Sequence, residues 1–296
     1  MTGKDRIDAT GAGWLVGFAL LFAVNQVVIR WTNQGLQPVF YAGVRSLVAM
    51  VPVTLWMVWR GIPLRIAPGT VGAGVLIGLA FSAEFLFLFL ALDLTTVVHT
   101  SILFYAMPVW LALAGHFLLP GERMNAVKAA GLALAFAGVV WSIAQRGGGG
   151  TASLVGDFCA VLGSMGWAAT AFLARGSAMR RVRPEVQLMW MLAVSALVML
   201  GLSPLFGPLI RDLVPLHLVA LGVQAVVVVA GGYIGWLLIL SLYPPAAVAS
   251  FSFLTPLFGV LLGWLLLDEP VRPGTFGALG LVVAGIMLMN RVARPV

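Results

Sequence analysis

Long apolar blocks separated by short polar or Pro/Gly-rich breaks run along the whole chain. They lie near residues 12–30, 38–59, 70–92, 97–118, 126–143, 153–174, 185–206, 215–242, 246–267 and 274–290. An α-helix rises about 1.5 Å per residue, so roughly 20 apolar residues cross a hydrocarbon layer about 30 Å thick. Transmembrane β-strands would instead alternate apolar and polar residues, and the blocks show no such alternation. The pattern predicts an all-α polytopic membrane protein with ten transmembrane helices.

Composition and charge support this prediction and indicate which side of the membrane each end occupies. Apolar residues make up 61% of the chain and charged residues 9%, too little charge to cover the surface of a soluble protein of 296 residues. The net charge of +7 does not form a nucleic-acid-binding patch, because the basic residues sort by side of the membrane. Arg180, Arg181 and Arg183 give the strongest signal. We expect both termini in the cytoplasm, a lipid bilayer around the protein and no nucleic-acid partner.

The chain contains an internal repeat with a spacing of 145 to 148 residues. The matching residues keep the same order in both copies: Gly11 with Gly156, Phe22 with Trp167, Arg30 with Arg175, Gly74 with Gly222, Pro108 with Pro256, Gly115 with Gly263, and Glu122 with Glu269. We expect a first repeat over residues 1–146, a glycine linker over 147–152 and a second repeat over 153–296. Because each repeat holds five helices, an odd number, the second copy enters the membrane from the opposite face. Inverted repeats are typical of transporters that work by alternating access, with the solute site between the halves.

Two stretches of the chain resemble halves of a known repeat. Residues 92–140 contain Pro108, Gly115, Gly121-Glu122 and Gly138, and residues 240–288 contain Pro256, Gly263, Asp268-Glu269 and Gly285. Both resemble the second half of an EamA-type repeat, and the whole chain is similar to ten-helix exporters of the drug/metabolite transporter superfamily, most of all to the bacterial amino-acid exporter branch. The resemblance implies a secondary transporter of the bacterial inner membrane that exports amino acids, aromatic, hydrophobic and other small ones, and related metabolites. A multidrug or cation exporter, or a nucleoside-type metabolite exporter, of the same superfamily is the alternative.

Arg45 and Glu84 are charged residues inside apolar blocks. Ionised groups in the hydrocarbon region are costly, so they pair, become neutral or face protein or water, and they are functional candidates by default. The two lie at similar depth below the outer ends of the second and third blocks, which is compatible with a pair. Such a pair would contact a zwitterionic solute or a coupling proton, or it would be a structural bridge between two helices. Arg45 also lies where EamA repeats often carry an arginine.

Other candidate substrate-binding residues supply an imidazole, aromatic rings and hydrogen-bonding groups. They are Asn25, His99, Trp167, Tyr233, Trp236 and Ser252. Imidazole titrates near neutral pH, so His99 is suited to bind a carboxylate or relay a proton, and equally to cap a helix end. Large aromatic side chains that line a cavity suit apolar and aromatic solutes, whereas packing against lipid or core is the alternative role for each of them.

Prolines and glycines inside the blocks predict kinks or hinges. Pro108 and Pro256 each remove a helical hydrogen bond, and Gly231-Gly232 interrupts an unusually long block.

Motifs of nucleotide-driven or enzymatic function are missing from the sequence. It contains neither a Walker motif nor a His-Glu-x-x-His pair, so we expect no ATPase, no metal or other cofactor and no enzymatic activity. An intramembrane enzyme is a further alternative that three scattered histidines do not favour. We expect a small-molecule solute as the partner and function as a monomer.

Overall fold

The described part of the chain is almost entirely helical. The computed structural model describes residues 7–63, 67–118, 124–145, 153–243, 248, 251 and 253–291. Within these residues the β-type pairing is an isolated antiparallel bridge between Leu36 and Ile210. In the part of the chain that the structure describes, eight helical segments are long and apolar enough to cross a membrane, and two more apolar helices are shorter. The predicted all-α membrane architecture is confirmed at this level.

The helices follow the predicted blocks closely. The first half contains α1 (Ala9–Thr32), α2 (Pro38–Trp59), α3 (Val71–Leu94), α4 (Val97–Phe104), α5 (Met107–Leu118) and α6 (Ala126–Ala144). The second half contains α7 (Leu154–Gly176), η1 (Ala178–Arg181), α8 (Pro184–Leu202), η2 (Ser203–Phe206), α9 (Pro215–Val223), η3 (Gln224–Gly231), α10 (Gly232–Leu242), α12 (Leu254–Leu267) and α13 (Pro273–Arg291). Proline opens α2, α8 and α9, where its missing N–H costs no helical bond.

The four predicted kink positions lie at helix ends or in the first turn of a helix. The helix is interrupted at Tyr105 and Ala106, between α4 and α5, so Pro108 falls in the first turn of a new helix. The segment η3 is a π-helix that ends at Gly231, and an ordinary α-helix continues from Gly232. Pro256 lies in the first turn of α12. The linker at 147–152 lies outside the described residues.

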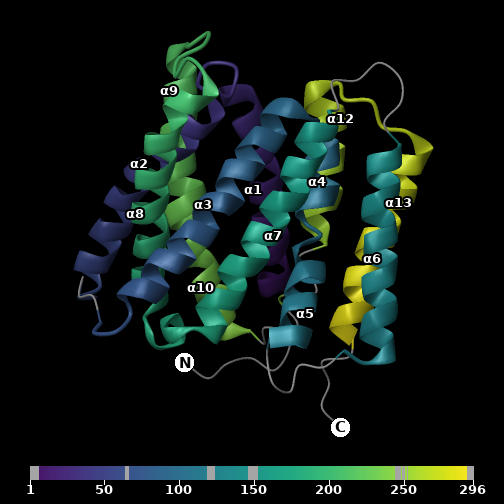
Figure 1. The fold of residues 1–296 in the computed structure, drawn as a ribbon, viewed down its shortest axis with the longest axis horizontal. Coiled ribbons are helices and arrows are strands. Elements are labelled where there is room, and N and C mark those ends of the chain that lie inside the picture. The colour runs from purple at the N-terminus through teal and green to yellow at the C-terminus, as the bar shows by residue number, and fades with distance from the viewer. Residues whose placement is uncertain are drawn as a thin grey trace.

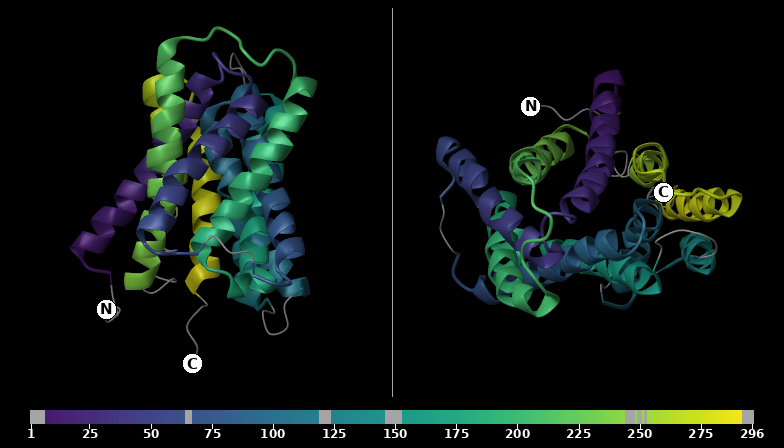
Figure 2. Two further views of the ribbon diagram at one scale, coloured as in Figure 1. Left: turned by 90° about the vertical axis from the view of Figure 1, so that its left-hand side faces the viewer. Right: turned by 90° about the horizontal axis from the view of Figure 1, so that it is seen from above.

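The helices are arranged so that two pairs lie at opposite ends of the bundle. α2 packs on α8 at one end and α6 on α13 at the other, as Figure 1 shows. Between them α3 packs along α7, and α1 along α12; Figure 2 shows the same helices from the side and end-on. α1 and α3 end, and α7 begins, at the face that is uppermost in Figure 1, called here the upper face. α1 begins and α13 ends at the opposite, lower face.

α2 shows how the sequence divides each helix between interior and lipid. Its buried stripe includes Arg45, Ala49 and Val53, which recur at helical spacing. Its exposed stripe is equally apolar: Leu47, Val51, Leu55 and Val58 are 51–65% exposed. A soluble helix would present polar side chains on that face, so this stripe fits a hydrocarbon environment.

Glycines on α7 set how closely the two halves approach at the centre. A Cβ atom added to Gly166 would lie 2.6 Å from the backbone nitrogen of Glu84 on α3, and one added to Gly163 would lie 3.2 Å from the Glu84 carbonyl oxygen. Small residues of this kind allow membrane helices to pack backbone against backbone. The contact between α3 and α7 is therefore tight at the level of Glu84.

Candidate functional site

Arg45 is among the largest fully buried side chains of the described residues, with 1% of its surface exposed. It projects from the inner stripe of α2 onto α3, where its guanidinium carbon lies 4.3 Å from the centre of the Phe85 ring and 4.8 Å from that of Phe89. The two phenylalanines are one helical turn apart and so present their rings on the same face of α3. Contact with ring faces stabilises a buried cation. However, Nε and Nη2 of Arg45 have no hydrogen-bond partner.

Glu84 directly precedes Phe85 on α3 and is buried, with 6% of its surface exposed. Its backbone packs on Gly166, and Thr170 of the same helix, α7, lies beside its carboxyl group. Arg45 and Glu84 attract each other electrostatically. Yet the structure forms no direct ion pair between these two described residues, and Oε2 of Glu84 has no hydrogen-bond partner. Both groups keep unused hydrogen-bonding capacity in the middle of the bundle.

Tyr41 and Gln224 extend this cluster into the second half of the chain. The Tyr41 hydroxyl donates to Oε1 of Gln224 at 2.5 Å, and both side chains are buried. The amide nitrogen Nε2 of Gln224 has no partner. Neither Tyr41 nor Gln224 was predicted from the sequence as a site residue. Tyr41 could have been found, because it lies one turn before Arg45 on the same face of α2.

An aromatic wall stands on the other side of Glu84. Trp167 on α7 stacks on Phe104, with ring centres 5.2 Å apart and planes at 18°, and meets Tyr105 edge-on at 5.5 Å. The break between α4 and α5 places Tyr105 here, beside Gln26 and Thr255. Gln26 also accepts a hydrogen bond from Ser101 at 2.7 Å. This wall joins α1, α4, α7 and α12.

The remaining predicted residues are spread along the bundle. Asn25 is buried on α1, and its Oδ1 has no partner. Trp236 on α10 meets Phe18 edge-on at 6.3 Å, nearer the lower face. The Tyr233 hydroxyl donates to the carbonyl of Pro184 at 3.1 Å, where α8 begins. Ser252 lies outside the described residues.

His99 belongs to the upper face. Its Nδ1 lies 3.1 Å from the carboxylate of Asp157, which also accepts a hydrogen bond from the Thr95 hydroxyl at 2.7 Å. Thr95 follows Glu84 by eleven positions, which is about 16 Å along a helix at 1.5 Å per residue. The structure therefore places His99 in a different polar cluster from Glu84.

Glu269 connects four helices at the upper face. Its carboxylate accepts the N–H groups of Val97 and Val98, at 2.8 Å each, at the start of α4, and lies 3.4 Å from Nε of Arg30 on α1. Arg30 also donates to the carbonyls of Leu92, at 3.0 Å, and of Thr95 at the end of α3. Burial raises the pKa of the Glu269 carboxyl group, an effect that the two N–H groups and Arg30 oppose.

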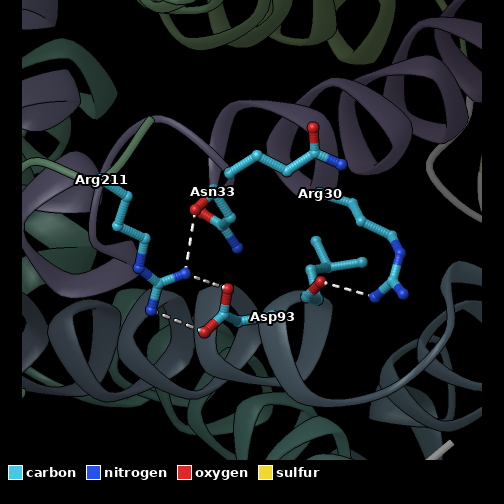
Figure 3. Close-up of a pocket in the computed structure, with 6 residues that line it drawn as sticks. Arg30, Asn33, Asp93 and Arg211 are labelled. Carbon is cyan, nitrogen blue, oxygen red and sulfur yellow. Dashed lines mark hydrogen bonds and ion pairs between the residues drawn. The ribbon is translucent and has the colours of Figure 1, made fainter. Parts of the chain in front are cut away.

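A second ion pair lies beside Arg30 on the same face. Arg211 binds Asp93 through two hydrogen bonds of 2.7 and 3.0 Å and donates to the carbonyl of Asn33 at 2.9 Å, as Figure 3 shows. These residues, with Arg30, Gln34 and Leu92, line a cavity of about 150 Å³. Arg30, Asp93, His99, Asp157, Arg211 and Glu269 are called the upper network below. The members of the upper network pair with one another and so cross-link the helix ends at this face.

Comparison with known proteins gives matches over both halves. The profile described as the EamA-like transporter family matches residues 9–144 and again residues 154–291. A protein of Escherichia coli (strain K12) named "Probable amino-acid metabolite efflux pump" is 26% identical over 283 residues, covering 91% of each chain. A protein of the same name in Salmonella typhimurium is 24% identical over 278 residues, again covering 91% of each chain. An "Uncharacterized transporter" of Archaeoglobus fulgidus is 27% identical over 282 residues, which cover 91% of this chain and 93% of that one.

A solved structure supports the fold. The chain titled "Crystal structure of protein" aligns with a TM-score of 0.66, covering 97% of this chain and 99% of its own length. At a sequence identity of 23%, this likeness supports the fold alone.

Proposed function

This chain belongs to the EamA-like transporter family, and from that premise we propose that it exports amino acids and related small metabolites by alternating access. The family and the names of the relatives describe transporters rather than enzymes. Two of these relatives carry the name of an amino-acid metabolite efflux pump, at 26% and 24% identity. The buried polar residues of this chain supply the further support.

The observation that carries the proposal is a pair of opposite charges buried where the two matched halves meet. Glu84 of the first half packs on Gly166 of the second, and Tyr41, one turn from Arg45, binds Gln224 of the second. Charges at such depth in an apolar bundle are costly and mark solute or ion pathways. We assign the solute contacts to Arg45 and Glu84, with Asn25 and Trp167 beside them. Trp236 would line the path toward the lower face, and His99 would act within the upper network.

The proposed architecture has ten membrane spans in two inverted repeats, residues 1–146 and 153–296, joined by the linker at 147–152. The two ranges matched by the family profile, and the packing of α2 on α8 and of α6 on α13, support this division. Both termini and the lower face would be cytoplasmic and the upper face external, in a bacterial inner membrane, with the monomer as the functional unit. Pro108, Pro256 and Gly231-Gly232 would act as hinges.

Cysteine labelling tests this topology. In a Cys159→Ala background, single cysteines at Arg181 and at Gly148 should react with a membrane-impermeant maleimide from opposite sides of the membrane. We expect Gly148→Cys to label in intact cells and Arg181→Cys only after permeabilisation. Labelling of both from the same side would contradict the inverted arrangement.

Transport by the purified chain tests the function itself. Proteoliposomes would be loaded with labelled amino acids, nucleosides and cationic dyes, and efflux would be compared with that from protein-free liposomes. We expect efflux of aromatic and hydrophobic amino acids, and its loss in Glu84→Gln. Efflux of dyes or nucleosides without amino acids would replace the proposal with a multidrug or nucleoside exporter of the same family.

A further inference from the structure

Arg45 keeps one edge of its buried guanidinium group without hydrogen-bond partners among the described residues. Its guanidinium carbon lies over the rings of Phe85 and Phe89 of α3, 4.3 and 4.8 Å from their centres. The two nitrogen atoms without partners, Nε and Nη2, carry N–H groups that point in parallel from one edge of the guanidinium group. Two parallel N–H groups match the two oxygens of a carboxylate and bind it through paired, charge-assisted hydrogen bonds.

Gln224, bound to the neighbouring Tyr41, adds a neutral donor from the second half of the chain. Its Oε1 is fixed by the Tyr41 hydroxyl, which leaves Nε2 as a buried amide group without a partner. Tyr41 and Arg45 lie one turn apart on the same face of α2, so the hydrogen bond from Tyr41 brings Gln224 of the second half to the helix face that carries Arg45. A carboxylate bound at Arg45 would thus have donors from both halves.

Glu84 supplies the complementary negative charge. It is close enough to attract Arg45, but no N···O distance within 4.0 Å joins these two described side chains, and its Oε2 has no partner. If the two residues formed a purely structural ion pair, each would satisfy the other, because an unpaired buried charge is strongly destabilising. Arg45 and Gln224 thus keep unused hydrogen-bond donors, and Glu84 keeps an unused acceptor. This arrangement fits a molecule that carries both a negative and a positive charge.

Deepening the proposed export function, on which it rests, we propose that these side chains bind the head group of an α-amino acid as a zwitterion. The Nε–Nη2 edge of Arg45 and the amide of Gln224 receive the carboxylate, and Glu84 receives the ammonium group. The aromatic wall of Trp167, Phe104 and Tyr105 lies beyond Glu84 and faces the solute's side chain. Both halves contact the solute, so its binding depends on how they are packed together.

Three probes that differ in one charge each test this assignment. L-Phenylalanine carries both charges, phenethylamine lacks the carboxylate, and N-acetyl-L-phenylalanine lacks the ammonium group. Dissociation constants would be measured by titration calorimetry with the purified full chain. We expect Arg45→Gln to weaken the two carboxylate-bearing probes about tenfold or more and to leave phenethylamine unchanged. Glu84→Gln should weaken L-phenylalanine and phenethylamine and leave N-acetyl-L-phenylalanine unchanged.

Matched variants keep the test decisive. Ser46 is next to Arg45, and its hydroxyl contacts that of Ser195 at 3.1 Å. Ser46→Ala should leave the affinities for all three probes unchanged. If Arg45→Gln does not fold, Arg45→Lys keeps the charge but loses the paired edge, and it should weaken only the carboxylate-bearing probes. An equal loss for all three probes in the Arg45 and Glu84 variants would overturn this assignment while amino-acid transport by the wild type stands. A wild-type protein that neither binds nor transports L-phenylalanine would instead overturn the proposed function.

Discussion

The first and third helices of the two repeats meet twice in this molecule, and the two contacts are built differently. At one, α7 packs on α3; at the other, α1 faces η3 and α10. The 145- and 148-residue offsets of the repeat make these contacts equivalent, since Trp167 corresponds to Phe22 and Glu84 to Gly232. The first contact is continuous along both helices, whereas the second is sparse.

Small and large residues exchange places between the two contacts. In the α3–α7 contact the small residue is on the first helix of the repeat: Gly166 of α7 lets the backbone of Glu84 come close. In the α1–α10 contact the small residue is on the third helix: Gly232 faces the Phe22 ring, whose nearest atom would lie 3.7 Å from an added Cβ. Backbone packing is rigid, while aromatic rings change rotamer without moving a helix. We therefore expect α3–α7 to stay fixed during transport and α1–α10 to open.

The largest difference in stability is expected between two variants that each add one methyl group, one at the α3–α7 contact and one at the α1–α10 contact. Gly166→Ala forces a Cβ against the Glu84 backbone and should lower the free energy of unfolding by about 3 kcal/mol. Gly232→Ala meets only ordinary van der Waals contact and should change it by less than about 1 kcal/mol. Thermal unfolding in detergent measures both. Equal losses would remove the distinction between the two contacts.

The second largest effect on stability is expected from the upper network, where Glu269 contacts Arg30 of α1. Glu269→Gln weakens charge-assisted bonds to Arg30 and to the start of α4 and should cost about 2 kcal/mol of stability. In a Cys159→Ala background it should also raise the reactivity of a cysteine placed at the buried Asn33, which lines the cavity at this face, toward an external thiol reagent. Asp268→Asn removes a neighbouring, exposed carboxylate and is the matched control. A network that closes the upper face would be contradicted if the two variants behaved alike.

Replacing either of two tryptophans, Trp167 on α7 or Trp236 on α10, should alter the selectivity between large and small amino acids. Trp167→Ala removes the ring stacked on Phe104, and Trp236→Ala removes the ring that meets Phe18. Each should change the ratio of export rates for tryptophan and alanine by about fivefold, which corresponds to about 1 kcal/mol. Trp167→Ala should also lower stability, because its ring packs on Phe104 and Tyr105. Uniform slowing for both amino acids at normal folded yield would move the affected tryptophan out of the path.

The smallest effect is expected at the end of α3. Asp93 pairs with Arg211, which is 36% exposed, so Asp93→Asn should cost only about 0.5 kcal/mol at low salt and nearly nothing at high salt. Asp212→Asn, next to Arg211, is the control for charge alone. Chemical unfolding at two ionic strengths measures the difference. A loss that persists at high salt would show a more deeply buried pair.

The sequence predicted the spans and the buried charges because both signals are local. Hydropathy identifies a helix from its own residues, and a charge such as Glu84 stands out inside an apolar block. The interruptions near Pro108 and at Gly231 likewise follow from residues that disturb a helix at their own position.

The partners of those charges could not be predicted from local patterns. Tyr41 and Gln224 are 183 positions apart, and neither is unusual for its surroundings. The sequence analysis considered Arg45 mainly as an ion-pair partner of Glu84, whereas Arg45 packs on two phenylalanine rings. His99 was weighed as a solute contact, but its pairing with Asp157 depends on how α4 and α7 meet. Each of these outcomes is decided by packing between distant segments.

Distances between spin labels show whether α1–α10 opens during transport while α3–α7 stays fixed. In a Cys159→Ala background, one labelled pair would report on α1–α10 (Trp14→Cys with Leu238→Cys) and another on α3–α7 (Val71→Cys with Arg175→Cys), all at exposed positions near the lower face. Pulsed electron paramagnetic resonance would be recorded in nanodiscs with and without L-phenylalanine. We expect the solute to shift the α1–α10 distance distribution and to leave the α3–α7 distribution unchanged. A shift of equal size in the α3–α7 pair would contradict this expectation.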